Sequence, residues 1–147
     1  IGIKDSKTTE QRLKGYQKAL ADAKLVVDER YIEMGDSFNR EDGYKLAEKL
    51  YRKCPDLTAI FVYNDVMATG VLDFFNDLGL RIPGDIAVVG YDNSVASYTR
   101  PKLTTMDLHK EKMVEEAMDI LFKRIAGEDF GLRHEQILPQ LIIGESS

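Results

Sequence analysis

The sequence is poor in the residues that build disulfides and metal sites. Its 147 residues include one cysteine, two histidines and no tryptophan. A single cysteine excludes an intrachain disulfide and is typical of a reducing compartment. Cys54 follows a helical pattern and precedes Pro55, so we expect a half-buried structural thiol. His109 and His134 lie far apart in sequence without a cysteine partner, so we expect no metal site.

Long apolar runs and excess positive charge are also missing. No run approaches the ~20 apolar residues that cross a bilayer, and the first residues lack the basic segment and apolar stretch of a signal peptide. Together with the single cysteine, these absences lead us to expect a cytoplasmic protein with no membrane partner. The formal net charge is −5, and no basic stripe occurs of the kind that contacts nucleic-acid phosphates. We therefore do not expect this chain itself to contact DNA.

Motifs of catalysis and cofactor binding are absent as well. The sequence has no Gly-x-Ser-x-Gly elbow, no Walker-type phosphate loop and no Gly-x-Gly-x-x-Gly dinucleotide motif. Cys54 has no histidine close to it, and the acidic pair Glu115 and Glu116 lies on a solvated helix face. We therefore expect neither an enzyme nor a cofactor.

Short apolar runs alternate with helical patterns, which is typical of βα units and a mostly parallel sheet. The runs predict strands at 1–3, 25–33, 58–65, 86–92, 103–108 and 137–146. The helical patterns predict helices from Thr8 or Thr9 to Ala23, and over 42–54, 65–79 and 110–127, with Gly79 and Gly127 ending the last two. We therefore predict one α/β domain, an open sheet with helices on both faces.

Two of these helices are apolar over an unusually large surface. The helix at 65–79 has one apolar row of Met67, Val71, Phe74 and Leu78 and another of Ala68, Leu72 and Phe75. Such width indicates packing on the sheet and also against a neighbour, such as another subunit. The helix at 110–127 is expected to bury Met113, Ala117, Ile120, Leu121 and Ile125.

Polar residues stand at the carboxyl ends of two predicted strands, where open α/β sheets bind ligands. Asn64 ends one strand and Asp92 ends another, while Arg12 lies in the first turn of the helix after the first strand. The three side chains are therefore expected to converge on one cleft. A carboxylate, an amide and a guanidinium together suit a polyhydroxy ligand. Phe38, in the loop at 35–43, could add an apolar face for a sugar or base ring.

Each of these polar residues also has a structural alternative. Asp65 is expected to be the N-cap of its helix. Asn64 could form a turn, and Asp92 could cap a short loop. Arg12 could instead pair with Glu10 or Asp5.

Four stretches, in order along the chain, carry a family resemblance. They are RLKGYQKAL, AIFVYNDVMATGVLDFFNDLGLRIPGDIAVVGYDN, RPKLTTM and LPQLIIGESS. They resemble the R-x-x-G-aromatic-x-x-A-L, N-D-x-M-A-x-G, P-x-D-I-x-V-V-G-aromatic-D and P-x-L-T-T patterns and the closing strand of the lactose-repressor/galactose-repressor (LacI/GalR) family. The resemblance covers nearly the whole chain.

The resemblance implies a periplasmic-binding-protein-like I fold, in which a small effector binds between two α/β lobes of a bacterial transcription regulator. This chain resembles the second lobe (1–108 and 139–147) plus a segment (109–138) that returns to the first lobe. The first lobe and the helix-turn-helix DNA-binding domain of the family lie outside it. The alternative is a periplasmic sugar-binding protein of a transport system, which shares the fold.

The resemblance also assigns residues. Arg12, Asn64 and Asp92 match positions that contact the effector, which in the family is often a sugar or nucleobase. Phe38 matches the family's stacking aromatic if one extra residue is allowed after the preceding Gly-Asp, and Ser37 takes that place otherwise. A homodimer is implied as well, with Leu72, Phe75 and Tyr98 at its interface.

The same resemblance raises a question about the helix at 110–127, which in the family packs on the first lobe. Exposing its apolar row would cost about 1.5–3 kcal/mol for each side chain. We therefore expect this helix either to fold back on the chain's own sheet or to pack against a second copy.

Overall fold

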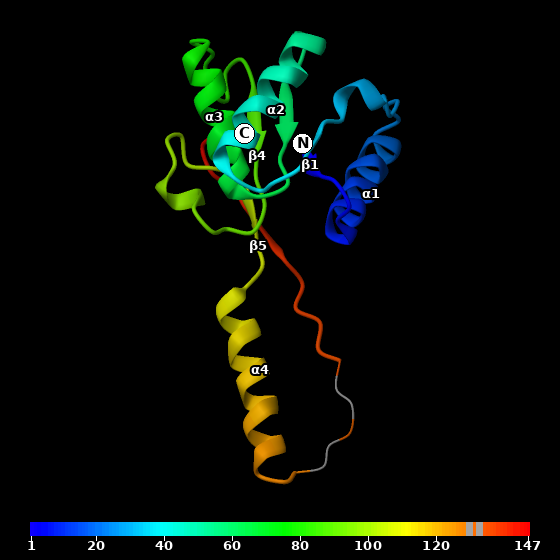
Figure 1. The fold of residues 1–147 in the computed structure, drawn as a ribbon, viewed down its shortest axis with the longest axis vertical. Coiled ribbons are helices and arrows are strands. Elements are labelled where there is room, and N and C mark those ends of the chain that lie inside the picture. Colours follow the sequence, from blue (N-terminus) through cyan, green and yellow to red (C-terminus); the bar gives the residue numbers. More distant parts are fainter. Residues whose placement is uncertain (129–130, 132–133) are drawn as a thin grey trace.

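The computed structural model describes residues 1–128, 131 and 134–147, and strands and helices alternate along it (Figure 1). The strands are β1 (Gly2–Ile3), β2 (Met34–Gly35), β3 (Ala59–Phe61), β4 (Ala87–Val89), β5 (Thr105–Asp107) and β6 (Gln140–Ile142). The α-helices are α1 (Lys7–Asp22), α2 (Arg40–Lys53), α3 (Asp65–Asp77) and α4 (Lys110–Ile125). Two short 3-10 helices span Glu29–Tyr31 and Ala96–Tyr98. The predicted α/β architecture is confirmed.

The strands are short, and most of them are parallel. β1 pairs with β2 and β3 pairs with β4 in parallel, whereas β5 and β6 are antiparallel. A backbone hydrogen bond from Tyr63 to Ile1 joins the first pair to the second, and a parallel bridge between Val89 and Thr104 joins β4 to the segment before β5. The carboxyl ends of β1, β3 and β4 therefore meet at one edge.

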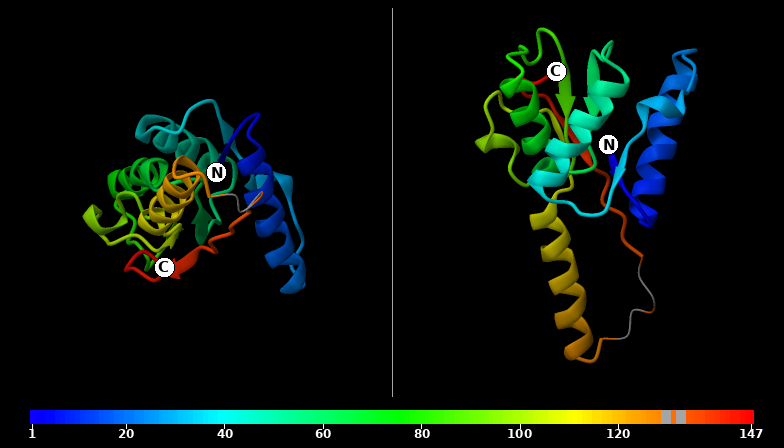
Figure 2. Two further views of the ribbon diagram at one scale, coloured as in Figure 1. Left: turned by 90° about the horizontal axis from the view of Figure 1, so that it is seen from below. Right: turned by 45° about the horizontal axis from the view of Figure 1, so that its top comes forward.

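The core lies between the sheet and two closely packed helices, α2 and α3. α1 lies beside β1, on the side away from that helix pair (Figures 1 and 2), and Thr9 is its one buried residue. The buried apolar side chains of the core come mainly from α2, β3, α3 and β4: Leu46, Ala47, Leu50, Ile60, Val62, Met67, Ala68, Val71, Leu72, Phe74, Phe75, Ile86 and Val88. No helix within the described residues is long and apolar enough to cross a membrane.

The prediction of a strand at 25–33 is wrong, because none of these residues lies in a strand. Only Met34 and Gly35, just beyond it, pair with β1. Asp28 accepts a hydrogen bond from the backbone of Arg30 and so caps a 3-10 helix, which interrupts an extended chain. Val26 is 88% exposed. The apolar residues at the start of this segment therefore do not face the core.

Other boundaries differ by a few residues. The N-cap of α1 is Ser6, whose hydroxyl accepts from the backbone N–H of Thr9, and not Thr8 or Thr9. α2 begins at Arg40 because Asn39 caps it. Gly79 and Gly127 follow the ends of α3 and α4 with φ of 72° and 79°, which confirms both predicted ends.

Cys54 is buried, not half-buried, and its thiol lies 3.6 Å from the carbonyl oxygen of Arg30. The sequence predicted only partial burial, because the turn that covers the thiol lies 24 residues earlier in the chain.

α4 projects away from the rest of the chain (Figure 1), and none of its residues is buried. The predicted burial of Met113, Ala117, Ile120, Leu121 and Ile125 is therefore wrong for this chain. Of the two alternatives for this helix, folding back on the chain's own sheet is not found, and packing against a second copy stays a prediction. Ile125 is 72% exposed. The N-cap residue before the helix is His109, which has a left-handed conformation with φ of 52°.

Candidate functional site

Asn64 follows β3 and caps α3. Its side-chain oxygen accepts a hydrogen bond of 2.7 Å from the backbone N–H of Met67. The prediction that Asp65 is the N-cap is therefore wrong, and the alternative of a turn-forming Asn64 is closer to what is found. The amide nitrogen of Asn64, which is half-buried, donates to no acceptor among the described residues. Asn64 can therefore cap the helix with its oxygen and offer its N–H groups to a ligand.

Asp92 follows β4 in a left-handed conformation, with φ of 98°. One carboxylate oxygen accepts 2.9 Å from the backbone N–H of Ser94, so Asp92 does cap a short loop. The same oxygen lies 3.8 Å from the Nζ of Lys110, the first residue of α4. The side chain is 22% exposed. Asp92 therefore keeps acceptor capacity at the surface of this edge.

Arg12 lies between two aromatic rings. The carbon at the centre of its guanidinium group lies 4.3 Å from the ring centroid of Tyr63 and 3.8 Å from that of Tyr91. Nη1 donates to the carbonyl oxygen of Tyr63. No ion pair joins Arg12 to Glu10 or Asp5 in the described part of the chain, so that alternative is not realised. Such cation–π contacts hold the guanidinium in a fixed orientation.

These contacts connect the predicted residues to one another. Tyr63 directly precedes Asn64, and Tyr91 directly precedes Asp92, so Arg12 touches both strand ends. Sequence reasoning missed both tyrosines as members of the site. The available signal was an aromatic residue immediately before each polar residue at a strand's carboxyl end.

Phe38 stacks against the outer part of this group. Its ring centroid lies 6.3 Å from that of Tyr63 with an interplanar angle of 28°, and Phe38 is 58% exposed. The hydroxyl of Ser37 is buried and has no hydrogen-bond partner within the described residues. Of the two candidates for the aromatic position, Phe38 thus has an exposed ring, which stacks on the tyrosine that Arg12 contacts.

Asp65 lies behind the site and is fully buried. Its carboxylate accepts hydrogen bonds from the hydroxyl of Thr105 at 2.7 Å and from the backbone N–H of Ser94 at 3.0 Å. Burial, and secondarily the charge of Asp92, raises the pKa of Asp65 above its ordinary value of 3.8. The folded protein therefore holds this proton more tightly than the unfolded chain, and the contribution of Asp65 to stability decreases as the pH rises above 3.8 through the folded pKa.

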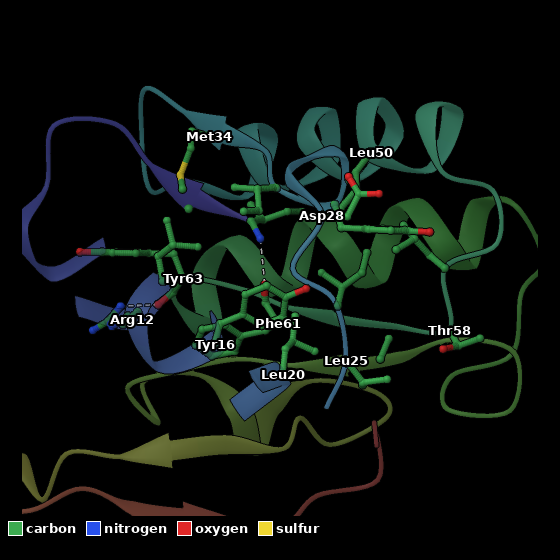
Figure 3. Close-up of a pocket in the computed structure, with 18 of the residues that line it drawn as sticks. Arg12, Tyr16, Leu20, Leu25, Asp28, Met34, Leu50, Thr58, Phe61 and Tyr63 are labelled. Atoms are coloured by element: carbon green, nitrogen blue, oxygen red, sulfur yellow. Dashed lines mark hydrogen bonds between the residues drawn. The ribbon is translucent and has the colours of Figure 1, made fainter. Parts of the chain in front are cut away.

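A cavity of about 530 Å³ lies between α1, residues 25–34 and β3 (Figure 3). Its walls are mostly apolar, with Tyr16, Leu20, Leu25 and Phe61 among them, and Arg12 and Tyr63 also line it. Asn64, Asp92 and Phe38 do not line it. The cavity is therefore separate from the edge where the polar residues gather, although it shares Arg12.

The residues predicted for a dimer interface do not form one surface. Leu72 is 3% exposed and Phe75 is fully buried, because both side chains extend from α3 into the core. They are not accessible to a partner, and this part of the prediction needs correction. Tyr98, in the 3-10 helix after β4, is 84% exposed.

No group of three or more His, Cys, Asp or Glu side chains that could hold a metal occurs in the part of the chain that the structure describes. His109 lies 3.8 Å from a carboxylate oxygen of Asp107. The candidate site therefore offers a guanidinium that donates, an amide that donates and accepts, and a carboxylate that accepts, and such groups bind polar organic ligands by hydrogen bonds.

Comparison with known proteins identifies a family. Residues 1–147 match the periplasmic binding protein-like domain family. The HTH-type transcriptional repressor PurR of Photobacterium profundum is 36% identical over 146 residues, covering 99% of this chain and 43% of that protein. PurR of Histophilus somni (strain 129Pt) is 39% identical over 142 residues, covering 95% of this chain and 42% of that protein. The chain thus spans less than half the length of the curated relatives it matches.

Solved structures are similar as well. The transcriptional regulator CelR, in complex with cellobiose, matches with a TM-score of 0.88 and 32% identity, covering 99% of this chain and 46% of that one. The Escherichia coli transcriptional repressor AscG matches with a TM-score of 0.88 and 28% identity, covering 99% of this chain and 53% of that one.

Proposed function

Since this chain belongs to the periplasmic binding protein-like family, we propose that it senses a small-molecule effector as part of a bacterial transcription regulator of the LacI type. The relatives and structural neighbours named above are transcriptional repressors and regulators. They favour this function over that of a transport protein, and they are not enzymes. The single observation that carries the proposal is the contact of Arg12 with the tyrosines that precede Asn64 and Asp92.

The effector in this proposal is a sugar, a nucleobase or a phosphosugar. Asp92 accepts hydrogen bonds from ligand hydroxyl or N–H groups, and the amide of Asn64 donates to a ligand oxygen. Arg12 anchors one end of the ligand through its fixed guanidinium, while the exposed ring of Phe38 covers an apolar ring face. The structural neighbour that is bound to cellobiose supports a sugar.

The regulatory step is a shift between two arrangements of two lobes. An effector that contacts both lobes binds the closed arrangement more tightly and so increases its population. Operator DNA is bound through a domain outside this chain. We further propose that the intact regulator is a cytoplasmic homodimer, with Tyr98 at its interface because it is a large apolar ring left exposed.

We expect Asp92→Ala and Asn64→Ala each to weaken effector binding about 10- to 100-fold, because each removes hydrogen bonds to a buried polar ligand group. Calorimetry on the full-length protein with a panel of sugars, nucleobases and phosphosugars measures this loss. Asp85→Ala is the matched control, since Asp85 pairs with Arg81 away from the site. Unchanged affinity in both site variants would show that the site is wrong.

Phe38→Ala is expected to weaken binding of the same effector about tenfold, because the variant loses an aromatic face worth about 0.5–1.5 kcal/mol beyond its buried area. Ser37→Ala should leave the affinity unchanged, since the hydroxyl of Ser37 is buried. The same calorimetric titration compares the two. A larger loss for Ser37→Ala than for Phe38→Ala would instead assign the contact to Ser37.

A further inference from the structure

Asp65 has a fully buried carboxylate, and it connects three elements. It is the first residue of α3, and its own backbone N–H donates to the carbonyl of Tyr91 at the end of β4. Its carboxylate accepts from Thr105 of β5 and from Ser94 in the loop after β4. The backbone N–H of Val95 donates to the same carboxylate. A single side chain thus ties α3, β5 and the loop that carries Asp92.

That loop has a backbone that needs such support. Asp92 and Asn93 both have positive φ, at 98° and 49°, a conformation that is costly for residues other than glycine. Gly90 is required at the start of the loop, because a Cβ there would lie 2.3 Å from the carboxylate of Asp65. The close approach of Gly90 and the hydrogen bonds from Ser94 and Val95 together wrap the loop around Asp65.

We propose that Asp65 is a positioning residue, whose buried carboxylate holds residues 92–95 in the conformation that presents Asp92 to the effector. The claim that the loop presents Asp92 to the effector, which is the functional half of the inference, rests on the proposed function. The claim that Asp65 holds the loop, which is its structural half, does not. The ionised form is the one that accepts all three donors, because protonation converts one oxygen from an acceptor into a donor. Effector binding is therefore expected to depend on the protonation state of a residue that never touches the effector.

The charges around Asp65 define how this pH dependence should look. Among the described residues, Asp92 is the charged group that acts on Asp65, and Lys110 of α4 lies against Asp92. The groups that donate hydrogen bonds to Asp65, the hydroxyl of Thr105 in β5 and the backbone N–H of Ser94 in the loop, are uncharged. Burial raises the pKa of Asp65, so its protonation begins at a higher pH than that of an ordinary carboxyl group. The hydrogen bonds from Ser94 and Val95 act against burial and lower this pKa, so they favour the ionised form. These two bonds are expected to weaken, and the loop to loosen locally, as the pH falls through that pKa, although burial makes the fold as a whole favour the protonated form.

Amide hydrogen exchange of the full-length protein, without effector, tests the structural half. Val95 is the specific reporter, since Ser94 also donates to Asp92. We expect Asp65→Asn to lower the protection factor of Val95 about tenfold or more, because the amide offers one acceptor oxygen where the carboxylate offers two. Asp73→Asn, on the exposed part of the same helix, should leave it unchanged. An unchanged Val95 in Asp65→Asn overturns the proposal.

A second measurement needs no variant of Asp65, should Asp65→Asn fail to fold. In the wild-type protein, the protection factor of Val95 should fall as the pH is lowered through the pKa of Asp65. The fall should persist in Asp92→Asn, which removes the neighbouring negative charge that acts on Asp65. Protection that is independent of pH, or a fall that disappears in Asp92→Asn, contradicts the role of Asp65.

Calorimetry with cellobiose as the probe tests the functional half. Asp65→Asn should weaken binding about tenfold when Asp92 is present, and should have little further effect in an Asp92→Ala background, as expected for two residues that act as a unit. If the binding losses caused by Asp65→Asn and Asp92→Ala are fully additive, the two residues do not act as a unit and the proposed coupling is wrong. If cellobiose does not bind the wild-type protein, cellobiose is not the effector. The protection factor of Val95 then still tests whether Asp65 holds the loop.

Discussion

Replacing Gly70 with alanine is expected to lower the free energy of unfolding by about 3 kcal/mol or more, because the added methyl group has no space. A Cβ at Gly70 would lie 1.9 Å from the carbonyl oxygen of Arg40 in α2. The reciprocal position is equally tight, since a Cβ at Gly43 would lie 2.0 Å from the carbonyl oxygen of Met67 in α3. Both obstacles are backbone atoms, so the two helices would have to separate.

Chemical denaturation of the full-length protein measures this loss, and Gly15→Ala is the matched control. Gly15 also lies inside a helix, α1, but a Cβ there meets no atom within 4 Å. Gly15→Ala should therefore stabilise the protein by about 0.5–1 kcal/mol, the ordinary helix preference for alanine over glycine. Equal effects of Gly70→Ala and Gly15→Ala would mean that the helix contact is not as close as described.

The second large effect concerns the apolar side chains of α4. Six large ones are exposed: Met113, Val114, Met118, Leu121, Phe122 and Ile125. We expect this surface to be covered in the full-length protein by the lobe outside this chain, and in the isolated chain by a second copy. The double substitution Leu121→Gln with Phe122→Gln should then destabilise the full-length protein by about 3 kcal/mol or more, from about 1.5–3 kcal/mol for each side chain.

In the isolated chain, the same double substitution should change self-association and not stability. There it should reduce concentration-dependent association, measured by sedimentation over a dilution series, without lowering the free energy of unfolding, because it removes no internal contact. Glu115→Gln with Lys112→Gln is the control, since both side chains are exposed and polar. An isolated wild-type chain that stays monomeric at every dilution would contradict the expectation.

Much of the candidate site could be predicted from the sequence because strand ends are encoded locally. The alternation of apolar runs and helical patterns placed Asn64 and Asp92 at carboxyl ends of parallel strands, and Arg12 at the start of a neighbouring helix. Their use as ligand contacts stays a prediction. The residues that hold them were not predictable in the same way. Tyr63 and Tyr91 became part of the site only when Arg12, distant in sequence, was placed between their rings.

The cap of α3 illustrates the limit of local reasoning. Asn64 and Asp65 are both good N-cap residues by type, and the sequence does not distinguish them. The structure does, because Thr105 and Ser94 come from other elements and supply donors that a buried carboxylate requires. Asp65 is thereby drawn into the interior, and Asn64 is left to cap the helix.

The sequence by itself determined the order of the elements, the mostly parallel sheet, the ends of α3 and α4 at glycines, and the edge where the polar residues stand. These features depend on periodicity and turn chemistry within a few residues. Only the tertiary structure decided which apolar surfaces are covered. It buried Leu72 and Phe75 in the core, exposed Val26, and left no residue of α4 buried. Burial depends on what lies opposite a side chain, and that is a property of the whole fold.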